Sequence, residues 1–290
     1  MHAPKKTQEF LSGMKFVFPE GTVKVSGTAQ EKKNSMLQKQ IRDYSPEINR
    51  MLKAGEKILF IVNSYEQSKI AGDCLASIVK GSFKVRYLVK DTDELKSNRA
   101  MYRKDLTEFK DDILVAPAII MERGHNIVND LGNAHLTTLV IGIRPMTDPD
   151  NYRTQNSKVN GYIMSKYYGT RVHCDIGTCK EIRRDAAVLS YKLRNHGFNF
   201  EQLDDALKTD IYITLFCMII QLIGRISRVG EPDQAAIPPK VIFLDGAFNS
   251  GKTSFKDFMI SYMNQLTSNE KTGIIANALY NPFYLAIKGD

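Results

Sequence analysis

Five short apolar runs constrain the fold of this chain more than any other feature of its sequence. They lie at residues 58–62, 83–89, 113–116, 136–143 and 241–244 and are rich in β-branched residues. Most are continuously apolar, which is typical of parallel strands covered on both faces. Segments with helical spacing separate several of them, among them a charged segment at 91–109. This β–α alternation predicts an α/β fold, with a mostly parallel sheet sandwiched between helices.

A second constraint comes from residues 221–230, which read Q-L-I-G-R-I-S-R-V-G and place Arg225 and Arg228 three residues apart. If this stretch is a helix entered from Gly224, both guanidiniums leave one face about one turn apart. Two planar, permanently charged forks suit a polyphosphate, because each can bind two oxygens and stabilise charge that develops there. A pair of arginines on a solvated helix is the alternative that this motif leaves open.

Q-x-x-G-R-x-x-R resembles motif VI of superfamily 2 helicases, and two earlier segments resemble motifs of the same family in the expected order. K-I-L-F-I-V-N-S at 57–64 is similar to motif IV, and I-L-V-A-P-A-I-I-M-E-R-G-H-N-I at 113–127 is similar to motif V. The resemblance covers residues 55–248. It implies the second RecA-like domain of a helicase or translocase.

The resemblance also implies roles for individual residues. Arg225 and Arg228 would be the catalytic arginine fingers. The residues that would face the nucleotide are Gln221, Gly224, Arg123, Gly124 and Asn126. Those that would touch the nucleic-acid backbone are Asn63, Ser64 and Pro117. Asn126 stands where the family usually carries an aspartate, so it can donate or accept a hydrogen bond but cannot form the family's ion pair.

The loop after residues 58–62 has two interpretations. Ser64 can cap the following helix, with Gln67 at the third helical position completing a capping box. The free N–H groups at such a helix start also suit a phosphate at the carboxyl end of a parallel strand. Asn63 and Ser64 are therefore expected either to contact the nucleic-acid backbone or only to cap the helix.

In this family the ATP site forms between two RecA-like domains, and the D-E-x-H or D-E-x-D box of the first domain is absent from this sequence. The resemblance therefore implies ATP, with Mg²⁺ held mainly by a first RecA-like domain in cis or in trans, and an ATP hydrolase that is inactive alone. It implies a nucleic-acid partner, DNA favoured over RNA. A non-catalytic nucleic-acid-binding or regulatory module with the same fold is the alternative.

A third interpretation comes from G-A-F-N-S-G-K-T, which matches the phosphate-binding loop pattern. Its defining residues are Gly246, Gly251, Lys252 and Thr253. A rearranged P-loop ATPase would also need a later strand that ends in a magnesium-binding aspartate. The 37 residues that follow contain no such strand. An acidic residue and a small turn after the last strand account for the segment equally well without a nucleotide.

The remaining segments define the expected domain organisation. Residues 1–54 are predicted to be an adaptor or linker, 55–248 the RecA-like domain, and 249–290 a helical tail. Residues 145–210 are a mostly helical insertion before the last strands, with helices at 181–195 and from 204 to 223. Tyr152, Tyr162, Tyr167 and Tyr168 of this insertion lie among basic residues. They are expected either to stack on single-stranded bases or, more commonly, to pack the insertion.

Composition sets the remaining limits. The 290 residues include 40 Lys and Arg against 32 Asp and Glu, and the resulting charge of +8 favours a polyanionic partner without naming one. The four cysteines lack paired C-x-x-C spacing, so no metal site is predicted and reduced thiols are expected. No signal peptide and no apolar run of about 18 residues is evident, so a cytoplasmic protein without a membrane partner is expected.

Overall fold

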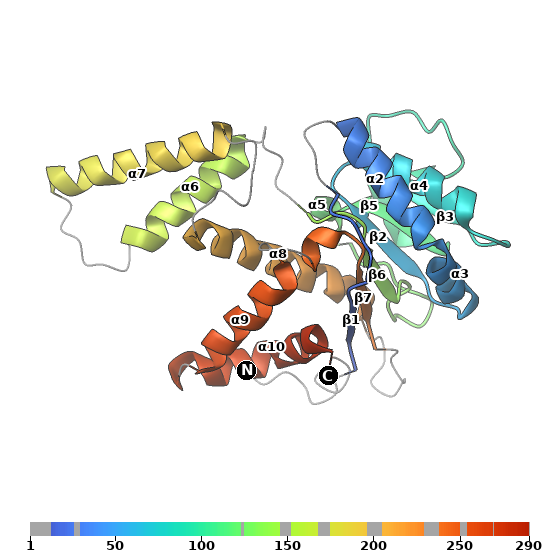
Figure 1. Cartoon of the computed structure of the whole chain (residues 1–290). Coiled ribbons are helices and arrows are strands. Elements are labelled where there is room, and N and C mark those ends of the chain that lie inside the picture. Colours follow the sequence, from blue (N-terminus) through green and yellow to red (C-terminus); the bar gives the residue numbers. More distant parts are fainter. Residues whose placement is uncertain are drawn as a thin grey trace. The chain divides into compact units, whose positions relative to one another are not determined.

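The computed structural model describes residues 13–25, 30–122, 125–145, 152–167, 175–195, 205–228, 238–249, 254–268 and 270–289 (Figure 1). By its internal contacts the chain divides into two compact units, one formed by residues 1–145 and 214–290 and the other by residues 146–213. The first unit holds the sheet, and the described part of the second is helical.

The described residues of the first unit form one sheet of seven parallel strands in the order β1-β7-β6-β2-β5-β3-β4. The strands are β1 (Lys15–Val17), β2 (Ile58–Val62), β3 (Val85–Leu88), β4 (Ala100–Met101), β5 (Ile113–Pro117), β6 (Thr138–Ile141) and β7 (Lys240–Phe243). The central strand β2 pairs with β5 and β6, and all five of its residues are buried. The predicted α/β class and parallel sheet are confirmed.

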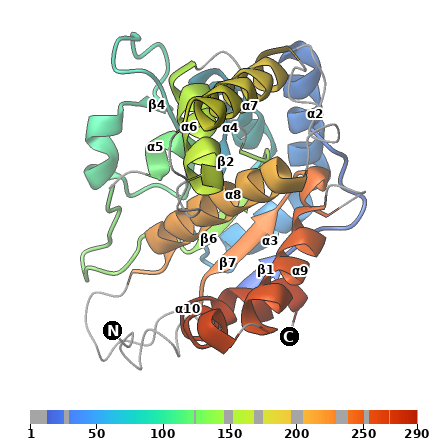
Figure 2. The ribbon, with the colours of Figure 1, turned by 90° about the vertical axis from the view of Figure 1, so that its left-hand side faces the viewer.

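Helices cover both faces of the sheet (Figures 1 and 2). α2 (Gln30–Asp43), α3 (Ser45–Lys53) and α4 (Tyr65–Ile78) lie on one face, where Phe60 and Val115 join their core cluster. On the other face lie α9 (Phe255–Ser268), α10 (Glu270–Lys288) and the part of α8 (Asp205–Ile226) that follows residue 213. There the ring of Phe243 lies 6.3 Å from that of Phe255 in α9.

Residues 1–54 were predicted to be an adaptor outside the core, and this prediction was wrong for the described part. β1 extends the sheet by pairing in parallel with β7, from Lys15↔Lys240 to Val17↔Ile242. Leu37 and Ile41 of α2 and Met51 of α3 are fully buried in the same cluster as β2. The segment is part of the fold because its apolar side chains cover one face of the sheet.

Residues 91–109 were predicted to form a charged helix, and this prediction was also wrong. The segment instead adds β4 to the edge of the sheet and then forms the short 3₁₀ helix η1 (Arg103–Glu108). Leu106 and Phe109 are buried and anchor η1. Of the apolar residues that suggested one face of a helix, Tyr102, Leu106 and Phe109 belong to η1 and its caps, and Leu95 lies exposed in the loop before β4.

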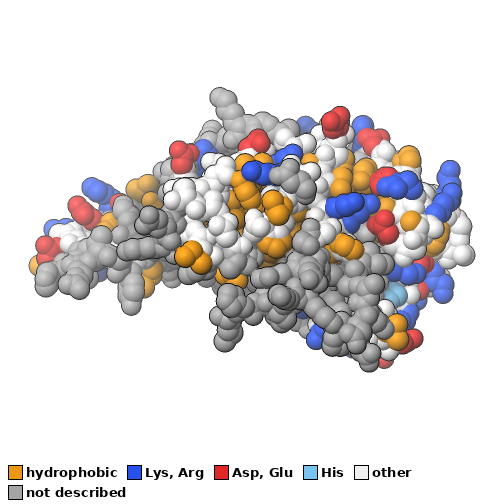
Figure 3. Space-filling model, turned by 90° about the horizontal axis from the view of Figure 1, so that it is seen from below, with side chains coloured by type: hydrophobic (Ala, Val, Ile, Leu, Met, Phe, Trp, Pro, Cys, Tyr) orange, Lys and Arg blue, Asp and Glu red, His pale blue; other side chains and the backbone are white. Residues whose placement is uncertain are grey.

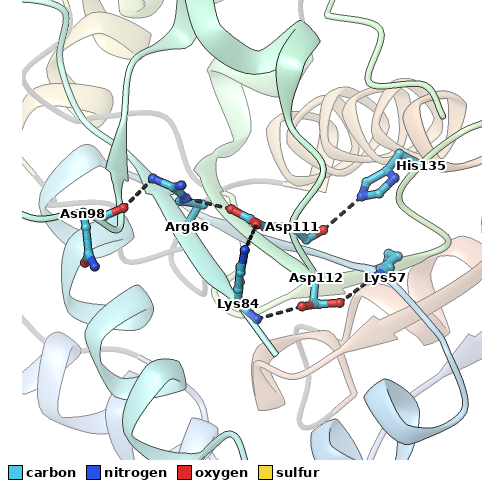
Figure 4. Close-up of polar contacts among 7 residues, drawn as sticks. All are labelled: Lys57, Lys84, Arg86, Asn98, Asp111, Asp112 and His135. Carbon is cyan, nitrogen blue, oxygen red and sulfur yellow. Dashed lines mark hydrogen bonds and ion pairs between the residues drawn. The ribbon is translucent and has the colours of Figure 1, made fainter. Parts of the chain in front are cut away.

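Charged side chains join the amino ends of the central strands (Figure 4). Asp112, which precedes β5, accepts a hydrogen bond from Lys84 N at 2.7 Å and pairs with the ammonium group of Lys57. Asp111 pairs with Arg86 Nε at 2.7 Å, and its carbonyl oxygen lies 2.9 Å from His135 Nε2. These contacts tie the starts of β2, β3 and β5 to the segment before β6.

The second unit contains two packed helices, α6 (Tyr152–Tyr167) and α7 (Ile176–Asn195). The hydroxyl of Tyr167 in α6 donates to Asp185 Oδ2 in α7 at 2.9 Å, and Leu189 of α7 is buried. Tyr167 therefore packs the insertion, as one of the two interpretations predicted. Tyr168 lies outside the described residues, and the side chain of Tyr152 is not among those described.

Among the described helices, the stretch Lys208–Ile226 of α8 is long and apolar enough to cross a membrane by length and composition alone. The sequence analysis expected no apolar run of about 18 residues, whereas this stretch passes a test of helix length and mean hydropathy. The core helix of a soluble protein passes the same test, and Ile219, Leu222 and Ile223 are buried in the first unit.

Exposed apolar residues also occur on α10, and Figure 3 shows hydrophobic side chains beside Lys and Arg on the face seen from below.

The burial of α2 predicts that its core residues stabilise the whole first unit. Leu37→Ala should lower the free energy of unfolding by about 2–5 kcal/mol, because it removes a fully buried side chain and leaves a cavity. Urea unfolding followed by circular dichroism measures the loss. Leu95→Ala is the matched control, since Leu95 is 49% exposed and its truncation should change stability by less than about 0.5 kcal/mol. Equal stability of the two variants would contradict the assignment of α2 to the core.

Candidate functional site

The arginines of 221–230 lie at and beyond the carboxyl end of α8. The helix runs through Gly224 and ends at Ile226, so Gly224 is inside the helix and Arg228 is past it. The expected geometry, with both arginines on one helical face, is therefore not formed. The helix extends this far because the apolar residues before Gly224 continue their packing to Ile226, which is 3% exposed.

Arg225 links the end of α8 to the turn that follows β5. Its Nε donates to the carbonyl oxygen of Met121 at 3.0 Å, and its Nη2 donates to that of Glu122 at 2.9 Å. These carbonyls close α5 (Ala118–Met121), immediately before Arg123 and Gly124. A planar fork that satisfies two successive carbonyls fixes both partners. Arg225 thus holds the end of α8 to the end of α5.

The other predicted nucleotide-facing residues fall into two groups. Gln221, Gly224, Asn126 and Arg228 are exposed, and the backbone carbonyl of Arg228 accepts from Ala134 N at 2.9 Å. Arg123 and Gly124 lie outside the described residues. The structure therefore brings Arg225 to the turn after β5, at Met121 and Glu122, and leaves Arg228 exposed two residues beyond the helix.

A basic cluster surrounds this turn, and two of its members, Arg103 and His125, were not predicted from the sequence. Arg103, the first residue of η1, donates through Nε to His125 Nε2. Burial lowers the pKa of His125, and the charges of Arg103 and Arg225 lower it further. The lowered pKa of His125 leaves the positive charge of this cluster to the arginines. Arg103 was missed because residues 91–109 were interpreted as one helix. The signal that could have found it is a basic residue close after the short strand Ala100–Met101.

The loop after β2 is held by its own polar side chains. Ser64 Oγ accepts from Gln67 N at 3.2 Å, which confirms the predicted helix cap. Gln67 Oε1 accepts from Asn63 N at 3.1 Å, one residue before the expected partner, and Asn63 Nδ2 donates to the Arg144 carbonyl at 3.2 Å. These contacts support the capping interpretation and give Asn63 a further role in joining β2 to the end of β6.

Pro117 ends β5 in register with Val62 and is buried. The chain turns at once into α5, as expected from a residue that cannot donate to a strand ladder. Its buried position gives it a structural role in shaping the turn. It does not place the ring on the surface where a nucleic-acid backbone would lie.

Asp245, directly after Leu244, receives hydrogen bonds from three separate segments. Its Oδ1 accepts from Val25 N at 3.0 Å and from Ala247 N at 2.9 Å, while its Oδ2 accepts from Arg144 N at 2.9 Å. The residue is 1% exposed, and burial raises the pKa of its carboxyl group although these three donors and the charge of Arg144 oppose the shift. From the sequence, this residue was recognised only as the acidic end of the last strand.

The first half of the phosphate-loop pattern is occupied by internal contacts. Gly246 N donates to Val23 O at 3.1 Å, and the amides of Ala247, Phe248 and Asn249 donate to Asp245 or Gly246. A Cβ on Gly246 would lie 2.6 Å from Thr22 O, so glycine is required here by close backbone packing. Gly251, Lys252 and Thr253 lie outside the described residues.

The described residues include no group of three His, Cys, Asp or Glu side chains arranged to hold a metal ion. The three described cysteines form no disulfide with one another. Cys74 is buried, and Cys179 and Cys217 are exposed.

Comparisons with known proteins add little to this geometry. No protein-family model matches the chain, and no curated protein sequence matches it. Among solved structures, the crystal structure of T4 UvsW is similar with a TM-score of 0.27 and 18% sequence identity. The match covers 45% of this chain and 26% of that one, so the chain spans about a quarter of the matched structure. A likeness this partial decides neither the fold nor the function.

The contacts of Asp245 predict a specific penalty for its amide analogue. Asp245→Asn keeps one oxygen but turns an NH₂ group toward either Arg144 N or Val25 N, so a buried N–H loses its acceptor. Stability should fall by about 1–3 kcal/mol, the usual cost of an unsatisfied buried polar group. Urea unfolding measures the loss. Asp43→Asn, at a carboxylate 60% exposed, is the control and should be nearly neutral. If both variants are neutral, the hydrogen bonds of Asp245 do not stabilise the fold.

Proposed function

We propose that this chain acts as the second RecA-like half of a nucleic-acid helicase or translocase. In this proposal it supplies arginines to an ATP site that another RecA-like domain, in cis or in trans, completes. The observation that supports it most is the pair of hydrogen bonds from Arg225 to the carbonyl oxygens of Met121 and Glu122. They join two segments that resemble different helicase motifs.

The two arginines differ in what they can do. Arg225 is half-buried, and two nitrogens of its guanidinium are used inside the chain, so its role is to position the turn and the end of α8. Arg228 is exposed and follows the helix closely. A guanidinium that extends from such a position can bind oxygens of a γ-phosphate presented by a second domain. We therefore assign the finger role to Arg228 and a positioning role to Arg225.

The charge of the site fits an anion. Arg103 and Arg225 both lie close enough to His125 to lower its pKa, so at neutral pH the ring adds no positive charge of its own. Two fixed cations near the motif V turn favour a polyphosphate over a neutral ligand. Hydrolysis of ATP bound between the two domains would supply the energy for the helicase or translocase. Mg²⁺ would be held by the other domain, which must bring the carboxylates that the described residues lack.

The P-loop alternative has less support. Phosphate-binding loops direct backbone N–H groups at the phosphate oxygens. The described amides of residues 246–249 are directed at carbonyl and carboxylate oxygens of the chain itself. An aspartate with three internal donors next to Gly246 also places negative character where a phosphate would have to lie. These contacts favour a structural turn at this position.

The isolated chain should show negligible ATPase activity, with or without single-stranded DNA, because the groups that hold magnesium and position water come from another domain. A coupled assay of phosphate release measures the rate. Lys252→Ala is the decisive control. Steady turnover by the isolated chain that disappears in Lys252→Ala would contradict the proposal and favour the P-loop alternative.

The finger assignment is tested in a reconstituted complex with a neighbouring domain or chain that carries a phosphate loop and a D-E-x-H box. There Arg228→Ala should lower kcat by about 10³-fold or more, as expected for an arginine finger, while the melting temperature stays unchanged. Arg225→Ala should lower both kcat and stability, because it frees two carbonyls and the end of α8. Arg50→Ala, at an exposed pair with Glu47, is the control. An unchanged rate in Arg228→Ala would make Arg228 a surface residue, and no ATPase activity in the wild-type complex would favour the non-catalytic module.

A further inference from the structure

We propose that the exposed face of α7 binds single-stranded nucleic acid and forms the strand contact of the insertion. The proposal rests on the proposed function, since it names where the second half of a translocase would hold its strand. It concerns the second unit alone, and a surface that consists of Lys180, Arg183, Arg184 and Tyr191, called here the α7 face.

The packing of α6 against α7 determines which side of α7 points outward. Asp185 faces α6, because its Oδ2 accepts from the Tyr167 hydroxyl at 2.9 Å. Leu189, one turn later, is 4% exposed and extends the same contact. A helix advances about 100° per residue, so residues near the opposite side of these two positions must point away from α6.

The residues on that opposite side have helical spacing. Arg183, Ala187 and Tyr191 follow Lys180 by three, seven and eleven positions, and Arg184 lies beside them. All of these residues are exposed, Tyr191 to 62% and the Arg184 side chain to 73%. One helical face therefore presents three cations and an aromatic ring. Apolar side chains border it at Ile176, 78% exposed, and Val188, 49% exposed.

Charge favours a polyanion as the occupant of this surface. α6 carries three Lys and Arg and no acidic residue, and α7 carries five against two acidic residues. Of the two acidic residues in α7, Asp185 is turned to Tyr167 and Glu181 lies at the border of the α7 face, and Asp175 borders it just before the helix begins. The only contact between Arg184 and an acid among the described ion pairs is one of 4.0 Å to Asp185. Three exposed cations within about one turn suit neighbouring phosphates of a nucleic-acid backbone.

The amino end of α7 is not itself the anion site. A hollow of 300 Å³ lies there, lined by Asp175, Ile176, Cys179, Lys180 and Arg183. Asp175 Oδ1 accepts from Thr178 N at 2.6 Å, and its backbone and side-chain hydrogen bonds with Thr178 lower its pKa. An ionised carboxylate thus already occupies the amino end of the helix. A phosphate would bind along the side of α7, at Lys180 and Arg183.

The mixture of charge and ring favours an unpaired strand. Phosphates of a single strand can lie on the three cations while an unstacked base packs on Tyr191 or on the apolar border, and every base offers such a face. A duplex keeps its bases stacked inside and would offer no base face to the tyrosine or to Ile176. The α7 face with its border extends from 176 to 191, about 22 Å at the rise of an α-helix.

Binding of the full chain to a fluorescent oligodeoxythymidylate of about 20 nucleotides tests this inference by anisotropy at about 50 to 200 mM salt. The triple variant Lys180→Ala, Arg183→Ala and Arg184→Ala should bind about tenfold more weakly at the lowest salt. The slope of log affinity against log salt should become shallower by about 2, because three phosphate contacts on a single strand are lost. Tyr191→Ala should weaken binding about tenfold with an unchanged slope, since stacking releases no counterions.

The matched control removes the same charge elsewhere. Lys32→Ala, Lys39→Ala and Lys53→Ala change three exposed lysines of α2 and α3, and this variant should keep the wild-type slope. Circular dichroism melts show whether each variant folds. An equal loss of affinity in both triple variants would show a net-charge effect, and unchanged affinity in the α7 variant or tighter binding of a duplex of the same length would each overturn the inference. Binding is measured without ATP and without a second domain, so failure here is distinct from failure of the proposed function.

Discussion

The buried carboxylate of Asp245 is the contact on which the first unit depends. It accepts backbone hydrogen bonds from Val25, Arg144 and Ala247, which belong to the segment after β1, the end of β6 and the turn after β7. The bond to Ala247 is local, whereas Val25 and Arg144 are each more than 100 residues from Asp245 in the sequence. A buried charge is costly unless it is fully hydrogen-bonded. Its donors must therefore stay in place, and with them the edge of the sheet that β1 forms.

Several other contacts follow from this arrangement. Gly246 can approach Val23 only because it lacks a Cβ, and Asn63, just after the central strand β2, donates to the carbonyl of Arg144 beyond the end of β6. The carboxyl ends of β2, β6 and β7 are thus fixed relative to one another. The side chain of Arg225 does the same between α8 and the turn after β5. A fixed frame of this kind suits the proposed role, because an arginine finger must be held in position before a nucleotide arrives.

The central part of this fold could be predicted well from the sequence, and its edges could not. β2 and β5 were recognisable because continuous apolar runs of β-branched residues are typical of buried parallel strands, and Ser64 was recognisable as a cap from local chemistry. β1 and β4 are short, with three and two residues, and β1 pairs with a strand that is remote in sequence. Periodicity cannot reveal a partner, so residues 1–54 were separated from a core that they help to form. The same limit applies to the site, where the contact of Arg225 with Met121 and the position of Arg103 depend on tertiary packing.

Hydrogen exchange of individual amides tests most directly whether Asp245 unites these segments. The account predicts that the amides of Val25, Arg144 and Ala247 exchange together, with protection close to that of the central strand β2, because none can open without breaking the shared carboxylate site. A Val25 amide that exchanges orders of magnitude faster than that of Arg144 would contradict it. That result would show that the segment after β1 detaches alone and is the adaptor that the sequence suggested.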